Sequence, residues 1–284
     1  MLAQLHSALA EPGVGRCASA VAVAAPELRP YVVGYGGYRV GGGAPVRRRM
    51  FPVTLTTLLL DANEGARLIT GARSSGGVHD GPPWRSGVSV GLTPAGVRAL
   101  LNAEAADLAD DVVSLDTRLS VLADQLAELP NWRSRVATLD TAFARRLGMP
   151  HAPRQSADWD GAGRGVGGRV SRVGAPELIV DRAWWRLQEA GARVGTVAAE
   201  LRVSRRYLEL EFRRRIGQSP KTVARVARLQ RALGAFTAPD ATLSGAAALG
   251  YADQSHLSRE TRALVGSTPG ELFAFVQDAV RPAH

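Results

Sequence analysis

The sequence predicts an α+β protein: a β-rich α+β domain in the N-terminal part, followed by an all-α domain of two helix-turn-helix units joined by a long helix. Three observations carry this prediction. The chain of 284 residues is long enough for two domains, each with its own core. Short β-branched or alternating segments lie between turn residues before residue 93. A helical pattern after residue 196 returns once, which indicates one supersecondary unit used twice.

The N-terminal part reads as strands and then helices. Strands are expected at 31–40, 53–60, 66–71 and 87–92, and helices at 93–101, 115–129 and 132–147. The segment Gly34-Tyr-Gly-Gly-Tyr38 is too irregular for a dinucleotide fingerprint and predicts a bulged, glycine-rich strand. We expect Arg47-Arg-Arg49 to be a solvated turn. His79, Asp80 and Trp84 lie in a Gly/Pro-rich stretch, which favours a surface loop over the mouth of a ligand site.

The sequence divides into a predicted N-terminal domain at 1–147, a glycine-rich linker at 148–176 and a C-terminal domain at 177–284. The glycines of 160–169 indicate a flexible connector, because no strand precedes them and no capped helix follows, as a nucleotide loop requires. A helix is expected at 181–193, with Trp184 and Trp185 used for packing.

The first repeated unit has the pattern of a helix-turn-helix. Thr196 is the expected cap of a short helix at 197–201, and Ser204 is a good N-cap for a second helix at 205–216. Spacing by four residues gives this second helix a buried stripe, and Gly217 ends it. The stripe is Leu208, Phe212 and Ile216, and the outward face carries Arg206, Leu210 and Arg214 with Tyr207 and Arg213 beside them. Ser219 and Pro220 open a long helix that reaches about residue 236, before Pro239.

The second unit repeats the first in register, without a gap. It begins at about residue 243, Asp253 stands where Ser204 does, and Gly266 stands where Gly217 does. Leu257, Leu264 and Val265 are expected to point inward, and Ser255, Arg259, Arg262 and Ala263 outward. Thr268 and Glu271 have capping-box spacing for the last helix. Thr261 replaces Phe212, so the second core is expected to be less well filled.

Charge favours a polyanionic partner. The net charge is +9, and Lys221 is the only lysine, so the positive charge is almost entirely arginine. Codon bias in a GC-rich genome is the alternative explanation for the total. Locally, residues 202–231 hold ten basic residues against Glu209 and Glu211, a balance of +8. Because this positive charge is concentrated on the first unit and the helix that follows it, we expect these residues to contact phosphates.

Other function classes lack their signatures. Cys17 is the only cysteine, which excludes an intrachain disulfide and fits a cytoplasmic setting. The five histidines have no partners at metal-ligand spacing, and no catalytic grouping is visible, so we expect no enzyme, metal or cofactor. No apolar run approaches the length of a membrane span, and the N-terminus has no secretion signal.

These motifs resemble the AraC-type (AraC/XylS) transcription regulators, a family of bacterial-type regulators with two helix-turn-helix units joined by a long helix. The second unit reads Gly250-Tyr-Ala-Asp253-Gln-Ser255-His256-Leu257-Ser-Arg259, followed by Gly266-Ser-Thr268-Pro269, and the resemblance covers about 177–275. It implies that each second helix enters a major groove of double-stranded DNA. The implied DNA-binding residues are Ser204, Arg205, Arg206, Glu209, Leu210, Arg213 and Lys221 in and after the first unit, and Gln254, Ser255, Ser258 and Arg259 in the second.

The sequence departs from the family at three positions. Leu210 stands where arginine is common and would read a thymine methyl group or nothing. Leu257 replaces a common phenylalanine, which is a conservative change. Thr261 replaces a core aromatic residue and predicts a less rigid second unit, so we expect the first unit to be the main reader. We expect His256 to be a structural residue rather than a base contact.

Three hypotheses follow for the whole chain. The first is a sequence-specific transcription regulator, modulated by its N-terminal domain and with a small-molecule effector, RNA polymerase and a second copy of the chain as further partners. The second is a DNA-targeted repair enzyme similar to alkyltransferases that carry this module, for which Cys17 would have to react alone. The third is that residues 1–147 only dimerise, without a ligand.

Overall fold

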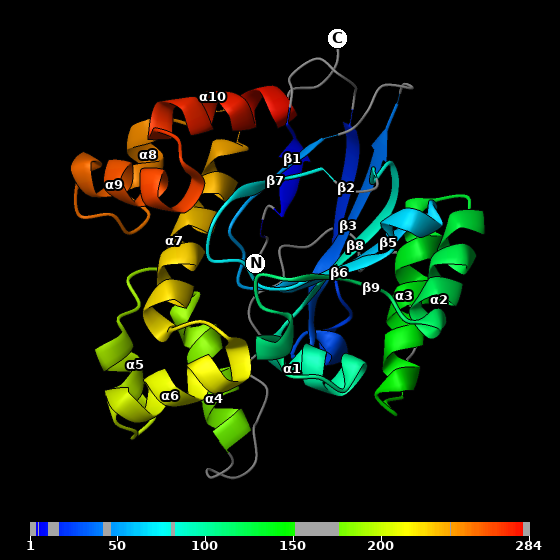
Figure 1. Ribbon diagram of the computed structural model, residues 1–284, viewed down its shortest axis with the longest axis horizontal. Helices are drawn as coiled ribbons and strands as arrows, with labels where there is room; N and C mark the ends of the chain where they lie inside the picture. The colour runs from blue at the N-terminus through cyan, green and yellow to red at the C-terminus, as the bar shows by residue number, and fades with distance from the viewer. Residues whose placement is uncertain are drawn as a thin grey trace.

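The computed structural model describes residue 4 and residues 6–10, 17–41, 47–80, 83–150, 176–238 and 240–280. Within them, a β-rich N-terminal region lies beside a helical C-terminal region, as the predicted α+β class requires (Figure 1). No helix in this part of the chain has the length and apolarity needed to cross a bilayer.

The N-terminal region contains two antiparallel sheets. The larger sheet has the strand order β2-β3-β8-β5-β6-β9 and the smaller one the order β1-β4-β7. Each neighbouring pair is antiparallel. The strands are β1 (Ser7–Leu9), β2 (Cys17–Val23), β3 (Val32–Val40), β4 (Arg48–Met50), β5 (Thr56–Asp61), β6 (Leu68–Thr70), β7 (Gly77–His79), β8 (Ser86–Leu92) and β9 (Val112–Ser114).

Two helices, α2 (Thr117–Glu128) and α3 (Trp132–Arg146), cover one face of the larger sheet (Figure 1). Their apolar side chains form one core with β3, β5 and β8, in which Leu58, Val88 and Phe143 are fully buried. Short helical turns fill the edges of this core. They are η1 (Pro26–Leu28), η2 (Glu64–Ala66), α1 (Pro94–Gly96), the π-helical η3 (Val97–Leu101) and η4 (Ala105–Leu108).

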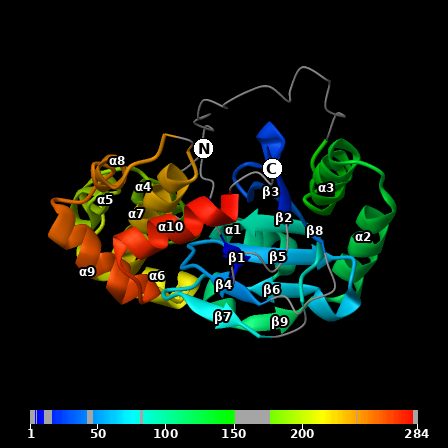
Figure 2. The same ribbon diagram turned by 90° about the horizontal axis from the view of Figure 1, so that it is seen from above.

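The C-terminal region has two helical lobes joined by the long helix α7 (Pro220–Phe236). Figure 1 shows the lobes at opposite ends of α7, and Figure 2 shows both on the same side of the N-terminal sheets. The first lobe holds α4 (Pro176–Leu187), α5 (Val194–Glu200) and α6 (Arg205–Ile216), and the second holds α8 (Leu243–Ala247), α9 (Gln254–Val265) and α10 (Pro269–Val280). Each lobe has its own core, which includes N-terminal side chains: Leu55 in the first, and Ala8 and Phe51 in the second.

Most predicted elements exist. The strands expected at 31–40, 53–60, 66–71 and 87–92 correspond to β3, β5, β6 and β8, and the three expected helices to α1 with η3, α2 and α3. Five strands were not predicted: β1, β2, β4, β7 and β9. All of these except β2 are three residues long, which is too short to show an alternating pattern.

The glycine-rich strand is confirmed. The register of β3 against β8 shifts between Val32 and Gly34, as a bulge requires. A Cβ on Gly37 would come within 2.8 Å of the Trp132 ring, so glycine allows α3 to approach the strand closely.

Two predictions for this region were wrong. Arg48 belongs to β4 and is 4% exposed, rather than lying in a solvated turn. Its guanidinium donates to the Trp84 carbonyl oxygen at 2.8 Å and lies over the Tyr38 and Trp84 rings. Trp84 is buried and not part of a surface loop, and His79 lies on β7 with its ring 4.6 Å from Trp84. The small sheet folds this segment inward, a long-range pairing that local composition does not reveal. Burial and the charge of Arg48 lower the pKa of the nearby His6 to about 3.

The predicted linker falls largely outside the described residues, which omit 151–175, and so does Pro239. The helix expected at 181–193 is α4, which begins earlier, at Pro176, and ends at Leu187. Pro176 is a favourable first helical residue, and the sequence pattern of this helix was read one turn too late. Trp184 is fully buried against Trp185, as the packing role predicted.

Candidate nucleic-acid interface

Helices α5 and α6 form the first helix-turn-helix unit. The Ser204 hydroxyl accepts from the Tyr207 amide at 3.0 Å, which confirms Ser204 as the N-cap of α6. Leu208, Phe212 and Ile216 are buried as the stripe predicts. Gly217 has φ 78° and ends the helix in the left-handed region.

The first helix of this unit differs from the prediction. It begins at Val194 with Arg193 as N-cap, and no side chain caps it, so Thr196 is not a cap. Val197 is 2% exposed and packs in the first-lobe core. The Val197 amide donates to the Arg193 carbonyl oxygen at 3.0 Å. The first turn of the helix therefore lies before Val197, the predicted start.

The outward side of α6 carries exposed basic side chains. Arg206, Arg213 and Leu210 are exposed, with 57% of the Leu210 side chain accessible. Glu209 is half-buried and accepts from the Arg213 guanidinium at 3.1 Å. Arg205 is exposed but folds back over α5, where a Cβ on Gly195 would come within 2.0 Å of its Nη2. Ser204, at the start of the helix, is exposed too.

Helices α8 and α9 form the second unit. The Asp253 carboxylate accepts from the His256 amide at 2.6 Å, and Gly266 has φ 70°, so the caps repeat those of the first unit. Thr268 and Glu271 form the predicted capping box, with the Thr268 amide donating to Glu271 at 2.7 Å. Along α9, the candidate side chains Gln254, Ser255 and Arg259 are exposed and Ser258 is half-buried.

His256 has a structural environment, in line with its expected role. Its Nδ1 accepts from the Ala252 amide at 3.3 Å, and its Nε2 lies 3.6 Å from the Glu260 carboxylate. The ring also packs edge-on against Tyr251. Burial raises the pKa of the Tyr251 hydroxyl above its usual value. These contacts tie the start of α9 to the turn before it.

Four of the ten basic residues behind the local charge of +8 are engaged inside the protein. Arg225 and Arg228 of α7 pair with Glu260 at 3.2 and 2.8 Å. Arg231 donates to the Gln188 carbonyl oxygen at 2.6 Å, and burial lowers the pKa of its guanidinium. The fourth, Arg215, is 6% exposed. The charge facing solvent therefore comes from Arg202, Arg205, Arg206, Arg213, Arg214 and Lys221.

Arg215 is the centre of an ion cluster that joins the first unit to the N-terminal region. Its guanidinium lies 2.9 Å from Glu211, 2.7 Å from Glu177 and 3.2 Å from Glu104. Burial alone would lower the pKa of Arg215, but the hydrogen bond to Glu211 and the charges of Glu177 and Glu104 raise it. Gly217 lies close to the backbone of Ala106 in η4. The N-terminal region thus contacts the C-terminal end of α6.

A second contact surface lies beside α9. Arg49 of β4 donates to the Ser267 hydroxyl and to the Val265 carbonyl oxygen, and lies over the Phe275 ring. The Gly76 amide donates to the Leu264 carbonyl oxygen at 2.7 Å. Both units therefore touch the N-terminal region at the C-terminal ends of their second helices.

Two exposed basic residues of the first unit, Arg202 and Arg214, were not assigned a site role from sequence. Arg202 lies in the turn of the first unit, exposed, at φ 56°, a region that side chains other than Asn, Asp and Gly rarely adopt. The repeat could not reveal the left-handed conformation of Arg202, because the residue with positive φ in the second unit, Gly250 with φ 122°, lies one position earlier in register. Within the described residues, no group of three His, Cys, Asp or Glu side chains is placed to hold a metal.

Comparison with known proteins agrees with this geometry. Residues 178–274 match a family model described as a helix-turn-helix domain. Residues 178–274 therefore form a helix-turn-helix domain of the AraC type. No curated protein sequence matches the chain.

Several solved structures are similar to it. The C-terminal domain of AraT, a response regulator from Geobacillus stearothermophilus, is 22% identical over 34% of this chain and 84% of its own, with a TM-score of 0.32. A probable AraC family transcriptional regulator from Rhodopseudomonas palustris is 24% identical over 37% of this chain and 99% of its own, with a TM-score of 0.32. ToxT from Vibrio cholerae is 10% identical over 95% of this chain and 96% of its own, with a TM-score of 0.41.

Proposed function

We propose that this protein is a sequence-specific regulator of transcription, in which α6 and α9 each enter a major groove of double-stranded DNA. The observation that carries the proposal is the exposed basic side of α6. The proposed DNA-binding residues are Ser204, Arg205, Arg206, Glu209, Leu210, Arg213 and Lys221 with the first unit, and Gln254, Ser255, Ser258 and Arg259 with the second. One chain would then span two successive grooves, about 34 Å apart, without a palindrome.

The residues divide by the kind of contact they can make. Arg206 projects from the first turn of α6 and has the planar donors that read guanine in the major groove. Lys221 lies in the first turn of α7, where it is exposed and suits a phosphate as a point charge. Leu210 can contact a thymine methyl group.

The proposal assigns residues 1–147 to regulation, 148–176 to a linker and 177–284 to DNA binding. Support for regulation comes from the contacts of Glu104 with Arg215 and of Arg49 with Ser267, which join the N-terminal region to both reading units. A change in the N-terminal region can therefore alter the relative placement of α6 and α9. The chain acts through binding and not as an enzyme. Its further partners are a small-molecule effector, RNA polymerase and a second copy of itself, in the cytoplasm.

Two substitutions test the DNA-binding assignment. Arg206→Ala should cost about 1–3 kcal/mol on the preferred sequence and relax the preference at one base pair, whereas Lys221→Ala should weaken all sequences alike. Both are measured by titrating genomic fragments and random DNA at several salt concentrations. Salt-independent binding, or equal effects of the two substitutions on preferred and random DNA, would refute the assignment.

A further inference from the structure

We propose that a cavity between the larger sheet and the helices α2 and α3 binds a small organic monocarboxylate. The cavity has a volume of about 230 Å³. Its lining comes from β3, β5 and β8 on one side and from α2 and α3 on the other, so rigid elements of the N-terminal core frame it. Such a ligand would give the proposed sensing role of residues 1–147 a chemical class. Only the regulatory effect of binding rests on that proposed function, and binding itself can be tested without it.

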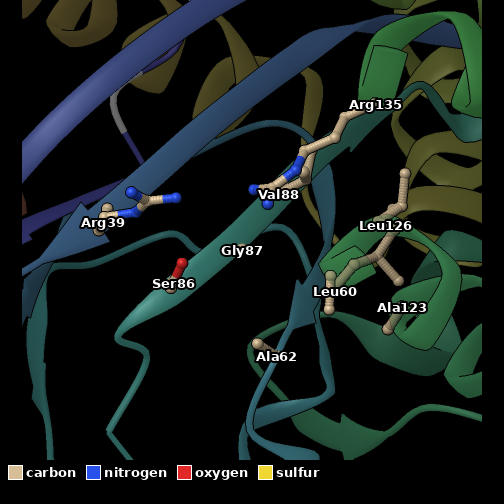
Figure 3. A pocket seen from close by; sticks show the side chains of 10 residues that line it. Arg39, Leu60, Ala62, Ser86, Gly87, Val88, Ala123, Leu126 and Arg135 are labelled. Carbon is tan, nitrogen blue, oxygen red and sulfur yellow. The ribbon is translucent and has the colours of Figure 1, made fainter. Parts of the chain in front are cut away.

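The mouth of the cavity is positively charged. Arg39 of β3 and Arg135 of α3 both line it, and their guanidinium groups point toward one another (Figure 3). Arg135 is held in place because its Nε and Nη2 donate to the Leu129 carbonyl oxygen at 3.3 and 3.2 Å. Arg39 makes no hydrogen bond or ion pair with a described residue, and none of the described residues that line the cavity is acidic. Two facing cations repel, and an anion between them removes that cost.

The floor of the cavity is apolar. Leu60, Val88 and Leu126 line it and are each no more than 2% exposed, and Ala123 lies beside them (Figure 3). The Ser86 hydroxyl, on the same side of the cavity as Arg39, adds a neutral hydrogen-bonding group near the charged mouth (Figure 3). An occupant must therefore present an anionic end to the arginines and a hydrocarbon body to the leucines.

Size and chemistry narrow the ligand further. One water occupies about 30 Å³ of liquid, so the cavity has room for about eight non-hydrogen atoms. It lies below the usual range of sites for drug-sized ligands. A planar carboxylate suits guanidinium groups, while the apolar floor disfavours inorganic phosphate and other fully hydrated anions. A carboxylate with a short apolar chain, of the size of hexanoate, meets all three requirements.

Calorimetry and thermal unfolding of the full chain test the site, with hexanoate as the probe. We expect a saturable rise in midpoint temperature, since a ligand that binds the folded state stabilises it. Hexanamide has the same shape without the charge and should bind at least about tenfold more weakly, as should inorganic phosphate. Equal binding of hexanoate and hexanamide, equal binding of phosphate, or no saturable effect of hexanoate at about 10 mM would overturn the proposal.

Matched variants locate the binding. Arg39→Gln removes an exposed charge, so the protein should fold normally while hexanoate binds at least about tenfold more weakly. Arg146→Gln removes an exposed charge from α3 away from the cavity and should change the affinity by less than about twofold. Unchanged binding by Arg39→Gln would overturn the site. Unchanged hexanoate binding by Arg39→Gln would not affect the proposal that α6 binds DNA. The effect of Arg206→Ala on DNA binding is measured without hexanoate, so each proposal can be refuted independently of the other.

Discussion

In the first helix-turn-helix unit, the fully buried ring of Phe212 fills the centre of the stripe on α6, whereas in the second unit Thr261 holds the same place on α9. Thr261 is also fully buried, and its hydroxyl donates to the Leu257 carbonyl oxygen at 2.8 Å. The polar group is therefore satisfied, but the second core contains a smaller side chain with fewer dispersion contacts. The two helices therefore begin and end at equivalent positions, but the side chain at this core position differs in size.

Equivalent carboxylates serve different neighbours in the two units. Glu211 holds Arg215 of its own helix, while Glu260 holds Arg225 and Arg228 of α7. The second unit thus uses the arginines of the connecting helix for its own attachment. Four exposed arginines remain on α6 against two on α9, which supports the proposal that the first unit contributes more to DNA binding.

The largest expected difference between the units is in core stability. Phe212→Ala should lower the free energy of unfolding by about 3–5 kcal/mol, because it leaves a cavity in a core that packs on Trp184 and Val223. Thr261→Ala should cost about 1 kcal/mol or less, since it removes one local hydrogen bond. Urea unfolding of the full chain, followed by far-UV circular dichroism, measures both. Comparable losses would show that the two cores are equally important.

The next largest effect concerns the attachment of α9. Glu260→Gln should destabilise the protein by about 2 kcal/mol, because two partly buried arginines lose their only carboxylate partner among the described residues. Glu211→Gln is the matched control and should cost about half as much, since Arg215 keeps Glu104 and Glu177. The same unfolding measurement applies, and the reverse order would contradict the different roles of the two carboxylates.

The smallest expected effects are on stability and concern the turns of the two units, where substitutions should act in opposite directions. Arg202→Gly should stabilise the protein by up to about 1 kcal/mol, because glycine adopts φ 56° without strain. Gly250→Ala should instead destabilise it by about 1–2 kcal/mol, because φ is 122° there. Thermal unfolding at fixed pH measures both changes. A loss of stability in Arg202→Gly would mean that its side chain stabilises the turn by more than the backbone strain costs.

Local signals explain what the sequence predicted. Ser204, Asp253, Gly217 and Gly266 mark the ends of α6 and α9 because a cap acts on residues within one turn of itself. Outward residues followed from a period of 3.6. The inward pairing of Arg228 with Glu260 was not predictable in the same way, since it joins residues on different helices.

The N-terminal region was harder to predict for the same reason. Arg48 is buried because β4 pairs with β1 and β7, and both of these strands lie far from β4 in sequence. The cavity near Arg39 and Arg135 is formed by a strand and a helix almost a hundred residues apart, so no window of sequence contains it. Its existence depends on tertiary packing.

The claim that the first unit dominates DNA binding is tested most directly by comparing Arg206→Ala with Arg259→Ala. Both remove an exposed arginine from the outward side of a reading helix. On a fragment selected for tight binding, Arg206→Ala should raise the Kd at least about tenfold and Arg259→Ala by less than about threefold. Equal losses, or a larger loss with Arg259→Ala, would contradict the account.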